Sequence, residues 1–357
     1  MKKLVSLILF FAASCLFMTA YAFDFKLFKF NKNQTKQEVS NIEILPTMNS
    51  ASNAKNQVWV GTFQLVWNDL TDEIIKHPIK FTNTNSVMAD NLNQKSFSVN
   101  DISENAYYKK WGLVSPETKQ IIESGIKKKF NETSDILNKI NWKPEKGKYI
   151  LYAMLKKDLV YTEKLHRLKN GYFEGSKAEV KYFGIENHST QKQREVINVL
   201  FYNNSSDFAV ALNSTQGDKV FLYRTNDSKT LSELYNDMNS KTKRYRGKIS
   251  FGQRDEFKAP IIDFKSEREF EELCNKPIKN SKFEIAQAIE TVQFKMDEAG
   301  VILKSEAAII TRLTSVMPAA DFPRYFHFNN KYVIFVAENG KKPYFAMLVS
   351  DAAKLQK

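Results

Sequence analysis

The sequence predicts a domain of the α+β class, with hairpin-connected strands and a few helices. Three observations support this prediction. Short apolar or alternating runs recur between clusters of Asn, Ser and Gly, as in strands joined by hairpins. Several other stretches carry apolar residues at helical spacing. Near the C-terminus, a segment of about 30 residues separates two strand-like blocks, which is far longer than a usual connection.

The N-terminus has the features of a secretory signal peptide. Lys2 and Lys3 precede the apolar run Leu4–Met18, and Ala20–Ala22 places small residues where a signal peptidase reads the chain. The apolar run is short for a membrane span. We therefore predict that residues 1–22 are removed. The protein is then exported, as a secreted, periplasmic or cell-surface protein with no stable membrane span.

The sequence holds two cysteines, Cys15 and Cys274. Cys15 follows Ala12-Ala13-Ser14, a weak match to a lipoprotein cleavage box that lacks the usual leucine. Cleavage after Ala22 would leave Cys274 alone, so no intrachain disulfide could form although export would permit one. We interpret Cys274 as a small core residue.

Residues 23–56 are poor in apolar side chains and rich in Asn, Lys, Gln, Ser and Thr, which predicts a flexible spacer. We expect a single domain at residues 57–352 and a short tail at 353–357. Helices are expected at Val58–Ile75, Glu117–Trp142 and Thr230–Met238. Strands are expected at Lys148–Leu155, Val180–Ile185, Val196–Tyr202, Ala209–Leu212, Lys219–Tyr223 and Phe257–Phe264.

The two C-terminal strand blocks are Thr291–Met296 and Lys331–Val336. The segment between them begins with an acidic turn, Asp297–Gly300, and ends at Pro323. Its first part, Val301–Ala308, alternates like a strand, with Val301, Leu303, Ser305 and Ala307 on one face. A tethered segment of this kind suggests a loop that can join a sheet.

In order and spacing, this part of the chain resembles the serpin family. Ile285–Gly300 (IAQAIETVQFKMDEAG) is similar to the segment that leads through the fifth strand of the serpin central sheet to the Glu/Gly hinge. Ser305–Ala308 (SEAA) resembles the alanine-rich hinge of the reactive-centre loop. Phe326–Val336 (FHFNNKYVIFV) resembles the F-x-A-x-R-P-F-x-F-x-I strand, and Tyr344–Val349 (YFAMLV) the closing hydrophobic strand.

Upstream segments extend the resemblance, with gaps, back to about Val58. Val58–Ile75 looks like the first serpin helix, and Pro78–Leu92 resembles the buried strand that turns into the second helix. Glu117–Trp142 resembles the helix across the front of the sheet. The region from Asn93 to Trp142 is shorter than in the family, so one or more helices are expected to be abbreviated or absent.

The resemblance implies a serpin-like architecture, with a large, mostly antiparallel central sheet, further sheets and surrounding helices, and an exposed loop at residues 301–323. Its hinge would be formed by Glu298, Gly300, Ser305, Glu306, Ala307 and Ala308. Counting forward from Gly300 puts the bait bond near Thr314-Ser315, and counting back from Phe326 puts it at Met317-Pro318; Arg312 and Leu313 are further candidates. The shutter positions, where polar residues bond across the opening sheet, would be Thr82, Asn85, Tyr152 and Glu290.

Two functions remain open. In the first, the protein is a suicide-substrate inhibitor of serine or cysteine proteases, whose cleaved loop inserts into the central sheet. In the second, it is a non-inhibitory binding protein of the same fold. Bulky hinge residues favour the second, because overpacking typically costs about 1–3 kcal/mol per site; they are Val301, Ile302, Leu303, Ile309 and Ile310.

We expect no enzymatic activity, cofactor or metal. The four histidines are far apart and lack metal-ligand spacing, and no nucleophile-elbow or phosphate-loop motif occurs. The net charge of +13 comes from scattered lysines, which predicts a solvated basic surface and no specific nucleic-acid partner. The expected partner of a monomeric chain is a target protease, if the protein is inhibitory.

Overall fold

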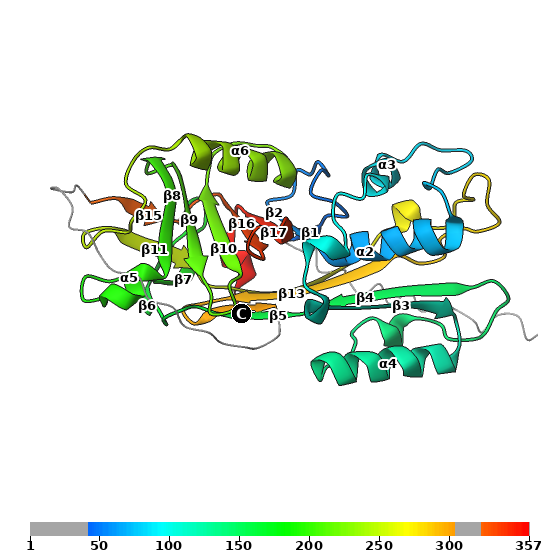
Figure 1. The fold of residues 1–357 in the computed structure, drawn as a ribbon. Coiled ribbons are helices and arrows are strands. Elements are labelled where there is room, and N and C mark those ends of the chain that lie inside the picture. The colour runs from blue at the N-terminus through cyan, green and yellow to red at the C-terminus, as the bar shows by residue number, and fades with distance from the viewer. Residues whose placement is uncertain (1–41, 304–322, 357) are drawn as a thin grey trace, which may run out of the picture. The chain divides into compact units, whose positions relative to one another are not determined.

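The largest sheet has seven strands and lies beneath helix α6 (Leu231–Arg244) in the computed structural model, which describes residues 42–303 and 323–356 (Figure 1). Leu231, Leu234 and Met238 of α6 are buried. Every residue of the two central strands, β16 and β17, is buried, which explains their unbroken apolar sequences. The strand order is β1 (Glu43–Ile44), β2 (Asn56–Val60), β17 (Pro343–Val349), β16 (Tyr332–Ala337), β10 (Lys219–Arg224), β9 (Asp207–Asn213) and β8 (Ile197–Asn204).

A second sheet has four strands, in the order β15 (Tyr325–His327), β11 (Glu256–Pro260), β7 (Glu179–Gly184) and β6 (His166–Tyr172). Strand β15 pairs parallel to β11, and the other pairs are antiparallel. Helix α5 (Gln191–Glu195) follows β7.

The third sheet takes in the segment after the acidic turn. Its order is β12 (Ile262–Glu269), β13 (Ile289–Met296), β14 (Gly300–Leu303) and β5 (Lys157–Val160), all antiparallel. Strand β14 therefore lies between β13 and β5 and pairs with both. Strand β5 follows β4 (Tyr149–Leu155) after one residue, and β4 pairs with β3 (Tyr107–Leu113) in a separate two-stranded sheet.

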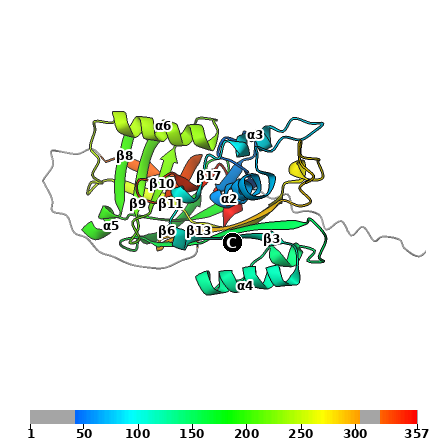
Figure 2. The ribbon, with the colours of Figure 1, turned by 45° about the vertical axis from the view of Figure 1, so that its right-hand side comes forward.

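Helices cover both faces of the two-stranded sheet formed by β3 and β4. Helix α2 (Gly61–Asp69), continued by a π-helical turn at Leu70–Ile75, lies on one side, and α4 (Pro116–Phe130) lies on the other (Figures 1 and 2). Ser115 caps the N-terminus of α4, and Asn131 ends it in the left-handed conformation at φ 55°. A short helix, α3 (Val87–Asn93), begins at the capping residue Ser86.

A buried ionic cluster joins β5 to the seven-stranded sheet. Lys157 Nζ lies 2.8 Å from Asp218 Oδ2 and 2.7 Å from Glu338 Oε1, and the Tyr344 hydroxyl lies 2.7 Å from Asp218 Oδ2. Burial acts to raise the pKa of Glu338, but hydrogen bonds from Lys157, Ser103 and Lys341 outweigh it and lower this pKa to about 2. The Glu338 carboxylate therefore remains charged, and Lys157 is the one lysine that contacts both carboxylates.

Most expected strands are confirmed. The blocks at 291–296 and 331–336 lie in β13 and β16, the run at 148–155 is β4, and the four hairpin runs are β7 to β10. Val301 and Leu303 are buried and Ile302 is exposed, as the alternation predicted. The second half of that alternating segment, residues 304–308, lies outside the described residues.

Two of the expected helices are wrong in part. Val58, Trp59 and Val60 belong to strand β2, so the helix expected at 58–75 begins only at Gly61. The helix expected at 117–142 stops at Phe130, and a loop with a short 3₁₀ turn at Leu137–Lys139 follows.

The ends of the domain also differ from the expected bounds. In the expected spacer, Ile42, Ile44 and Leu45 are buried, and β1 pairs with β2. In the expected tail, Leu355 is fully buried. None of the helices among the described residues is long and apolar enough to cross a membrane.

The ionic cluster makes a prediction about stability. Replacing Lys157 by Met leaves two buried carboxylates without their common partner, so we expect a loss of about 3–5 kcal/mol in urea unfolding at pH 7. The pKa of Glu338 is lowered on folding, so its stabilising effect is present above pH 4.5 and is lost as the pH falls toward 2. The difference between Lys157→Met and the wild type should shrink over that range.

Lys139→Met is the matched control, because Lys139 forms an exposed ion pair with Glu267. This variant should lose less than about 1 kcal/mol. Equal losses in the two lysine variants would contradict the role assigned to the buried cluster.

Candidate functional site: a gap in the third sheet

A cavity of about 600 Å³ lies between β4 and β13. These two strands do not pair with each other anywhere in the described residues, and β14 ends at the head of the cavity with Ile302 and Leu303 in its wall. The β4 edge that faces the cavity therefore carries backbone groups without a strand partner among the described residues. This is the edge to which another strand could be added.

Helix α2 forms the apolar floor of the cavity. The floor residues follow the helical spacing seen in the sequence, and they include Phe63, Val66, Trp67 and Leu70. Helix α2 starts directly after the buried strand β2, which fixes its position under the gap. Such a floor suits a segment that presents small or apolar side chains.

Glu290 is the acidic side chain buried in the cavity wall, with 3% of it exposed. Its Oε1 accepts a hydrogen bond of 2.6 Å from Thr62 Oγ1 on α2, and its Oε2 has no hydrogen-bond partner among the described residues. Burial raises the pKa of Glu290 to about 8, against the smaller lowering effects of Thr62 and the Phe63 backbone. The carboxyl group is therefore neutral at pH 7.

The turn before β14 is held at several points. The backbone of Glu298 accepts from Leu165 N at 2.9 Å, and its carboxylate pairs with Arg167 at 3.1 Å. Burial acts to raise the pKa of Asp297, but hydrogen bonds from Lys295 and the Ala299 backbone lower it overall. These contacts fix the point where the chain enters between β13 and β5.

Gly300 is required by its close approach to the neighbouring strand. A Cβ at this position would collide with the carbonyl oxygen of Leu159, which is a backbone atom and cannot move aside. The Gly of the sequence motif thus serves strand pairing between β14 and β5.

The predicted site residues fall in different places. Glu290 lies in the wall of the gap, whereas Glu298 and Gly300 lie in the turn and at the start of β14, at the end of that strand away from the gap. The side chain of Tyr152 is buried in the small core under α4, although Tyr152 also borders the cavity. Thr82 and Asn85 lie in an exposed loop, where Thr82 bonds to the Pro277 carbonyl, and the structure does not bring them to Glu290. The remaining hinge and bait residues lie outside the described residues: Ser305, Glu306, Ala307, Ala308, Arg312, Leu313, Thr314, Ser315 and Met317.

The sequence did not indicate Thr62, the hydrogen-bond partner of Glu290. It predicted the helix that forms the floor but extended this helix back to Val58, whereas Asn56–Val60 is strand β2 and α2 begins at Gly61. The signal was present in Val58-Trp59-Val60, three bulky residues in succession just before a glycine.

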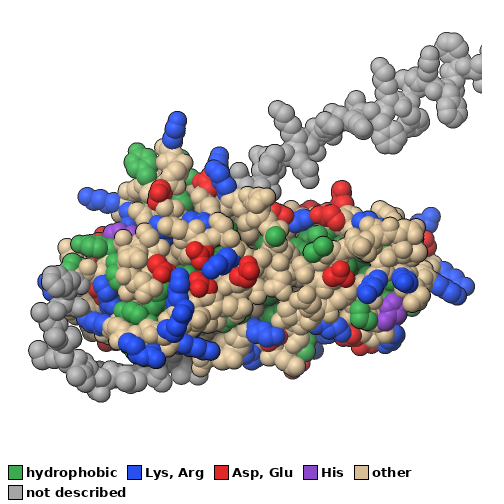
Figure 3. Space-filling model, turned by 90° about the horizontal axis from the view of Figure 1, so that it is seen from above, with side chains coloured by type: hydrophobic (Ala, Val, Ile, Leu, Met, Phe, Trp, Pro, Cys, Tyr) green, Lys and Arg blue, Asp and Glu red, His purple; other side chains and the backbone are tan. Residues whose placement is uncertain are grey.

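Charged side chains of both signs are interspersed on the surface seen in Figure 3, where Lys and Arg lie among Asp and Glu. This distribution agrees with the scattered lysines of the sequence.

Comparison with known proteins gives likenesses to serpin structures. No family model matches the sequence, and no curated protein matches it. The solved structure of *Arabidopsis* AtSerpin1 in its native stressed conformation is 14% identical with a TM-score of 0.49, over 86% of this chain and 93% of that one. Serpin48 of the insect *Tenebrio molitor* is 13% identical with a TM-score of 0.41, over 83% and 75%.

A third similar structure is thyroxine-binding globulin in complex with thyroxine. It is 10% identical with a TM-score of 0.44, over 66% of this chain and 65% of that one, which is less than two thirds of its length. The strand arrangement corrects one expectation. Val301–Leu303, expected as the start of an exposed loop, belong to strand β14 between β13 and β5, where Val301 and Leu303 are buried. The fold is of the predicted α+β class, with several sheets and helices outside them.

The state of Glu290 predicts how stability depends on pH. An acid whose pKa is raised on folding stabilises the folded protein most below its unfolded value near 4.5, and that stability is lost as the pH rises to about 8. The total loss is at most about 5 kcal/mol. Glu290→Gln should therefore raise the melting temperature at pH 8 and flatten its pH dependence between pH 5 and 8. Glu267→Gln on the neighbouring strand β12, where the side chain is exposed, should change neither.

Gly300 gives a second prediction for this site. Gly300→Ala should cost at least about 2 kcal/mol in urea unfolding, because the new Cβ forces β14 away from β5. Gly112→Ala makes the same change in strand β3, where the new Cβ would lie 3.4 Å from Thr118 Cγ2, an ordinary contact. A smaller loss in Gly300→Ala than in Gly112→Ala would refute the close-approach argument.

Proposed function

We propose that the gap between β4 and β13 receives the segment after Leu303 as an added strand, and that the protein is an exported, serpin-like inhibitor of serine or cysteine proteases. One observation carries this proposal: β14 is already paired with strands on both sides, and the gap continues along the direction in which β14 runs. Export rests on the predicted signal peptide. The partner would be the target protease.

The observed registers define how further residues would fit. Ile302 is opposite Lys295 on β13 and opposite Asp158 on β5. Because both pairings are antiparallel, each later residue of the segment would be opposite an earlier residue of β13 and of the β5–β4 segment. Residue 307 would therefore lie between Glu290 and Ala153, and its side chain would be on the same face as those of Glu290, Val301 and Leu303. Glu290 bonds to Thr62 of α2 on that face.

The small side chains occur where this register needs them. Ser305 and Ala307 would face the apolar floor, while Lys304 and Glu306 would face outward. Pairing along the whole of β4 would use residues 305–311, so the first bait candidate, Arg312, comes directly after the inserted stretch. The bait bond itself stays open among Arg312, Leu313, Thr314, Ser315 and Met317.

The chemistry would be supplied by the protease. Its serine or cysteine attacks the carbonyl carbon of the bait bond, an acyl-enzyme forms, and the new amino terminus leaves on the downstream part of the chain. The freed upstream end then enters the gap and carries the bound enzyme along. Inhibition requires insertion to be faster than attack by water on the acyl bond. The protein would contribute the inserted strand and the gap between β4 and β13 that receives it.

A second function is favoured by one residue. In the same register Ile309 would face inward, and a bulky side chain at an inserted position slows or prevents insertion. The protein would then be a non-inhibitory binding protein whose loop is cut without trapping the enzyme.

Incubation with a panel of serine and cysteine proteases tests the proposal. We expect an adduct between enzyme and chain that survives denaturing electrophoresis, and a cleaved form that melts at a higher temperature than the intact one. Ala307→Arg should abolish the adduct while the loop is still cut, because the arginine would have to enter the apolar floor beside Glu290.

Glu306→Arg is the matched control. Its side chain would face outward in the same register, so the adduct should persist. Cleavage of the wild type without an adduct and without a rise in melting temperature would favour the binding protein. Loss of the adduct in both variants would show that the register is wrong.

A further inference from the structure

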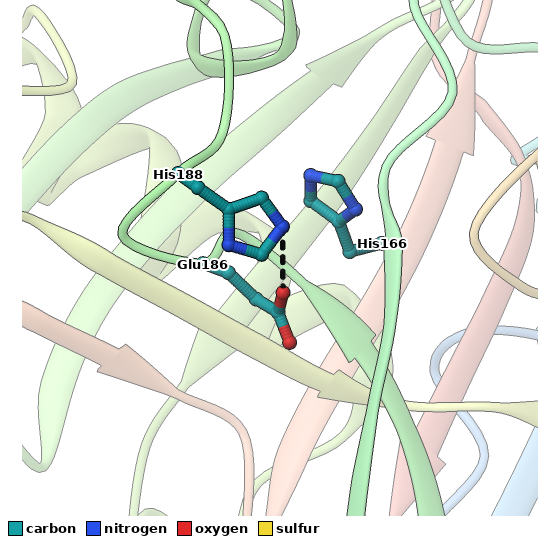
Figure 4. Close-up of side chains that lie close together, drawn as sticks. All are labelled: His166, Glu186 and His188. Carbon is teal, nitrogen blue, oxygen red and sulfur yellow. Dashed lines mark ion pairs between the residues drawn. The ribbon is translucent and has the colours of Figure 1, made fainter.

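Three side chains with metal-binding atoms meet at the corner between β6 and the loop after β7. They are His166, Glu186 and His188, and their ligand atoms all lie within 4.8 Å of one another (Figure 4). His188 Nε2 is 3.1 Å from Glu186 Oε2, and the two imidazole rings are 4.8 Å apart at their centroids with a tilt of 58°. Figure 4 shows both rings and the carboxylate at one place.

The backbone holds this cluster together. In the β6–β7 ladder His166 is opposite Gly184, so the loop that begins at Ile185 returns beside it. That loop is a tight turn, in which Glu186 N donates to Ser189 Oγ at 2.8 Å and Ser189 N donates to the Glu186 carbonyl at 3.0 Å. The turn holds the backbone positions of Glu186 and His188 beside the start of β6.

The ring of His166 has its own support. Its Nε2 lies 3.2 Å from Gln193 Oε1, and Gln193 Nε2 donates to the Lys164 carbonyl at 2.8 Å. Gln193 is buried and also completes the capping box of α5 with Thr190. A polar neighbour that orients an imidazole is typical of histidines that bind metals.

We propose that His166, Glu186 and His188 bind one divalent transition-metal ion of the zinc type. Two imidazole nitrogens and one carboxylate oxygen are a ligand set that zinc takes in proteins, with a fourth position left to water. Bonds of about 2.1 Å place such ligands about 3.4 Å from one another. One pair in the cluster is already closer than that, and the exposed His188 side chain can turn to complete the set.

The site lies next to the turn that leads into β14. Leu165 and Arg167, the two neighbours of His166, both hold Glu298, through the 2.9 Å backbone bond and the 3.1 Å ion pair. A bound ion would join the start of β6 to the β7–α5 loop at this point. The proposed metal site does not depend on the proposed protease inhibition, so an experiment can refute one of the two proposals and leave the other standing.

The sequence did not indicate this site because one of its three ligands comes from a different strand. Only one residue separates Glu186 from His188, but His166 belongs to β6, which precedes β7. Only the pairing of β6 with β7 brings them together.

The test is a titration of Zn²⁺ into purified protein without a histidine tag, first treated with a chelator, followed by calorimetry. We expect one saturable site per chain and a melting temperature that rises with Zn²⁺ concentration. His188→Ala should weaken binding at least tenfold. The His188 side chain is 71% exposed, so this change should leave the fold intact. His188→Cys, which restores a zinc ligand, should recover much of the affinity.

His327→Ala is the matched control, because His327 also lies beside a carboxylate, Glu256 at 3.0 Å, but lacks a third ligand within reach among the described residues. Its affinity for Zn²⁺ should equal that of the wild type. Cobalt(II) gives a second readout, since its visible absorption changes when it is held by two imidazoles. Absence of a saturable site, or equal binding by His188→Ala and the wild type, would overturn the proposal.

Discussion

Strand β14 keeps β13 and β5 one strand apart, and the rest of the site depends on this separation. Neighbouring strands lie about 4.7–4.9 Å apart, so two strands with a third between them are separated by about twice that distance. Because β5 leads into β4 after a single residue, β4 is held at a similar separation from β13 beyond the end of β14. Strand pairing on both sides of β14 therefore sets the width of the gap where it begins. A Cβ at Gly300 would collide with the carbonyl oxygen of Leu159, so β14 and β5 approach each other closely.

The gap is bordered by two very different electrostatic environments. At its head, Lys157 lies between the carboxylates of Asp218 and Glu338, and hydrogen bonds hold the pKa of Glu338 at about 2. Farther along, Glu290 has no cationic partner at hydrogen-bond distance among the described residues and is neutral at pH 7. A neutral carboxyl group can lie beside an apolar neighbour at little cost, whereas a charged one would favour water in the cavity. The middle of the gap is thus chemically suited to a small uncharged side chain.

Much of the fold could be predicted from local pattern. The strands were recognisable because buried strands give apolar runs and half-buried strands alternate, and β14 was recognised from alternation over only a few residues. The helix at 58–75 was misjudged because Trp59 happens to lie four residues before Phe63, which imitates a helical stripe across a strand–helix junction. Burial on both faces of β2 decided the outcome, and it depends on β17, almost 300 residues away.

The candidate site was less predictable, for a physical reason. A gap between two strands is a property of how sheets pair, and no residue pattern encodes the absence of a neighbour. Glu298, Gly300 and Glu290 were found because family resemblance pointed to them. Thr62 and the histidine cluster were not, because each relies on contacts between segments far apart in sequence.

The core is divided at the same boundary as the sheet. Residues between α4 and the two-stranded sheet of β3 and β4 form a small hydrophobic cluster of their own, separate from the main core. Val114, Ile122, Ile126 and Ile150 belong to it. Ala153 and Leu155 of β4 pack against the main core instead, so both faces of this two-stranded sheet are occupied. A widening of the gap would have to move β4 against the main core on one side while α4 travels with it on the other.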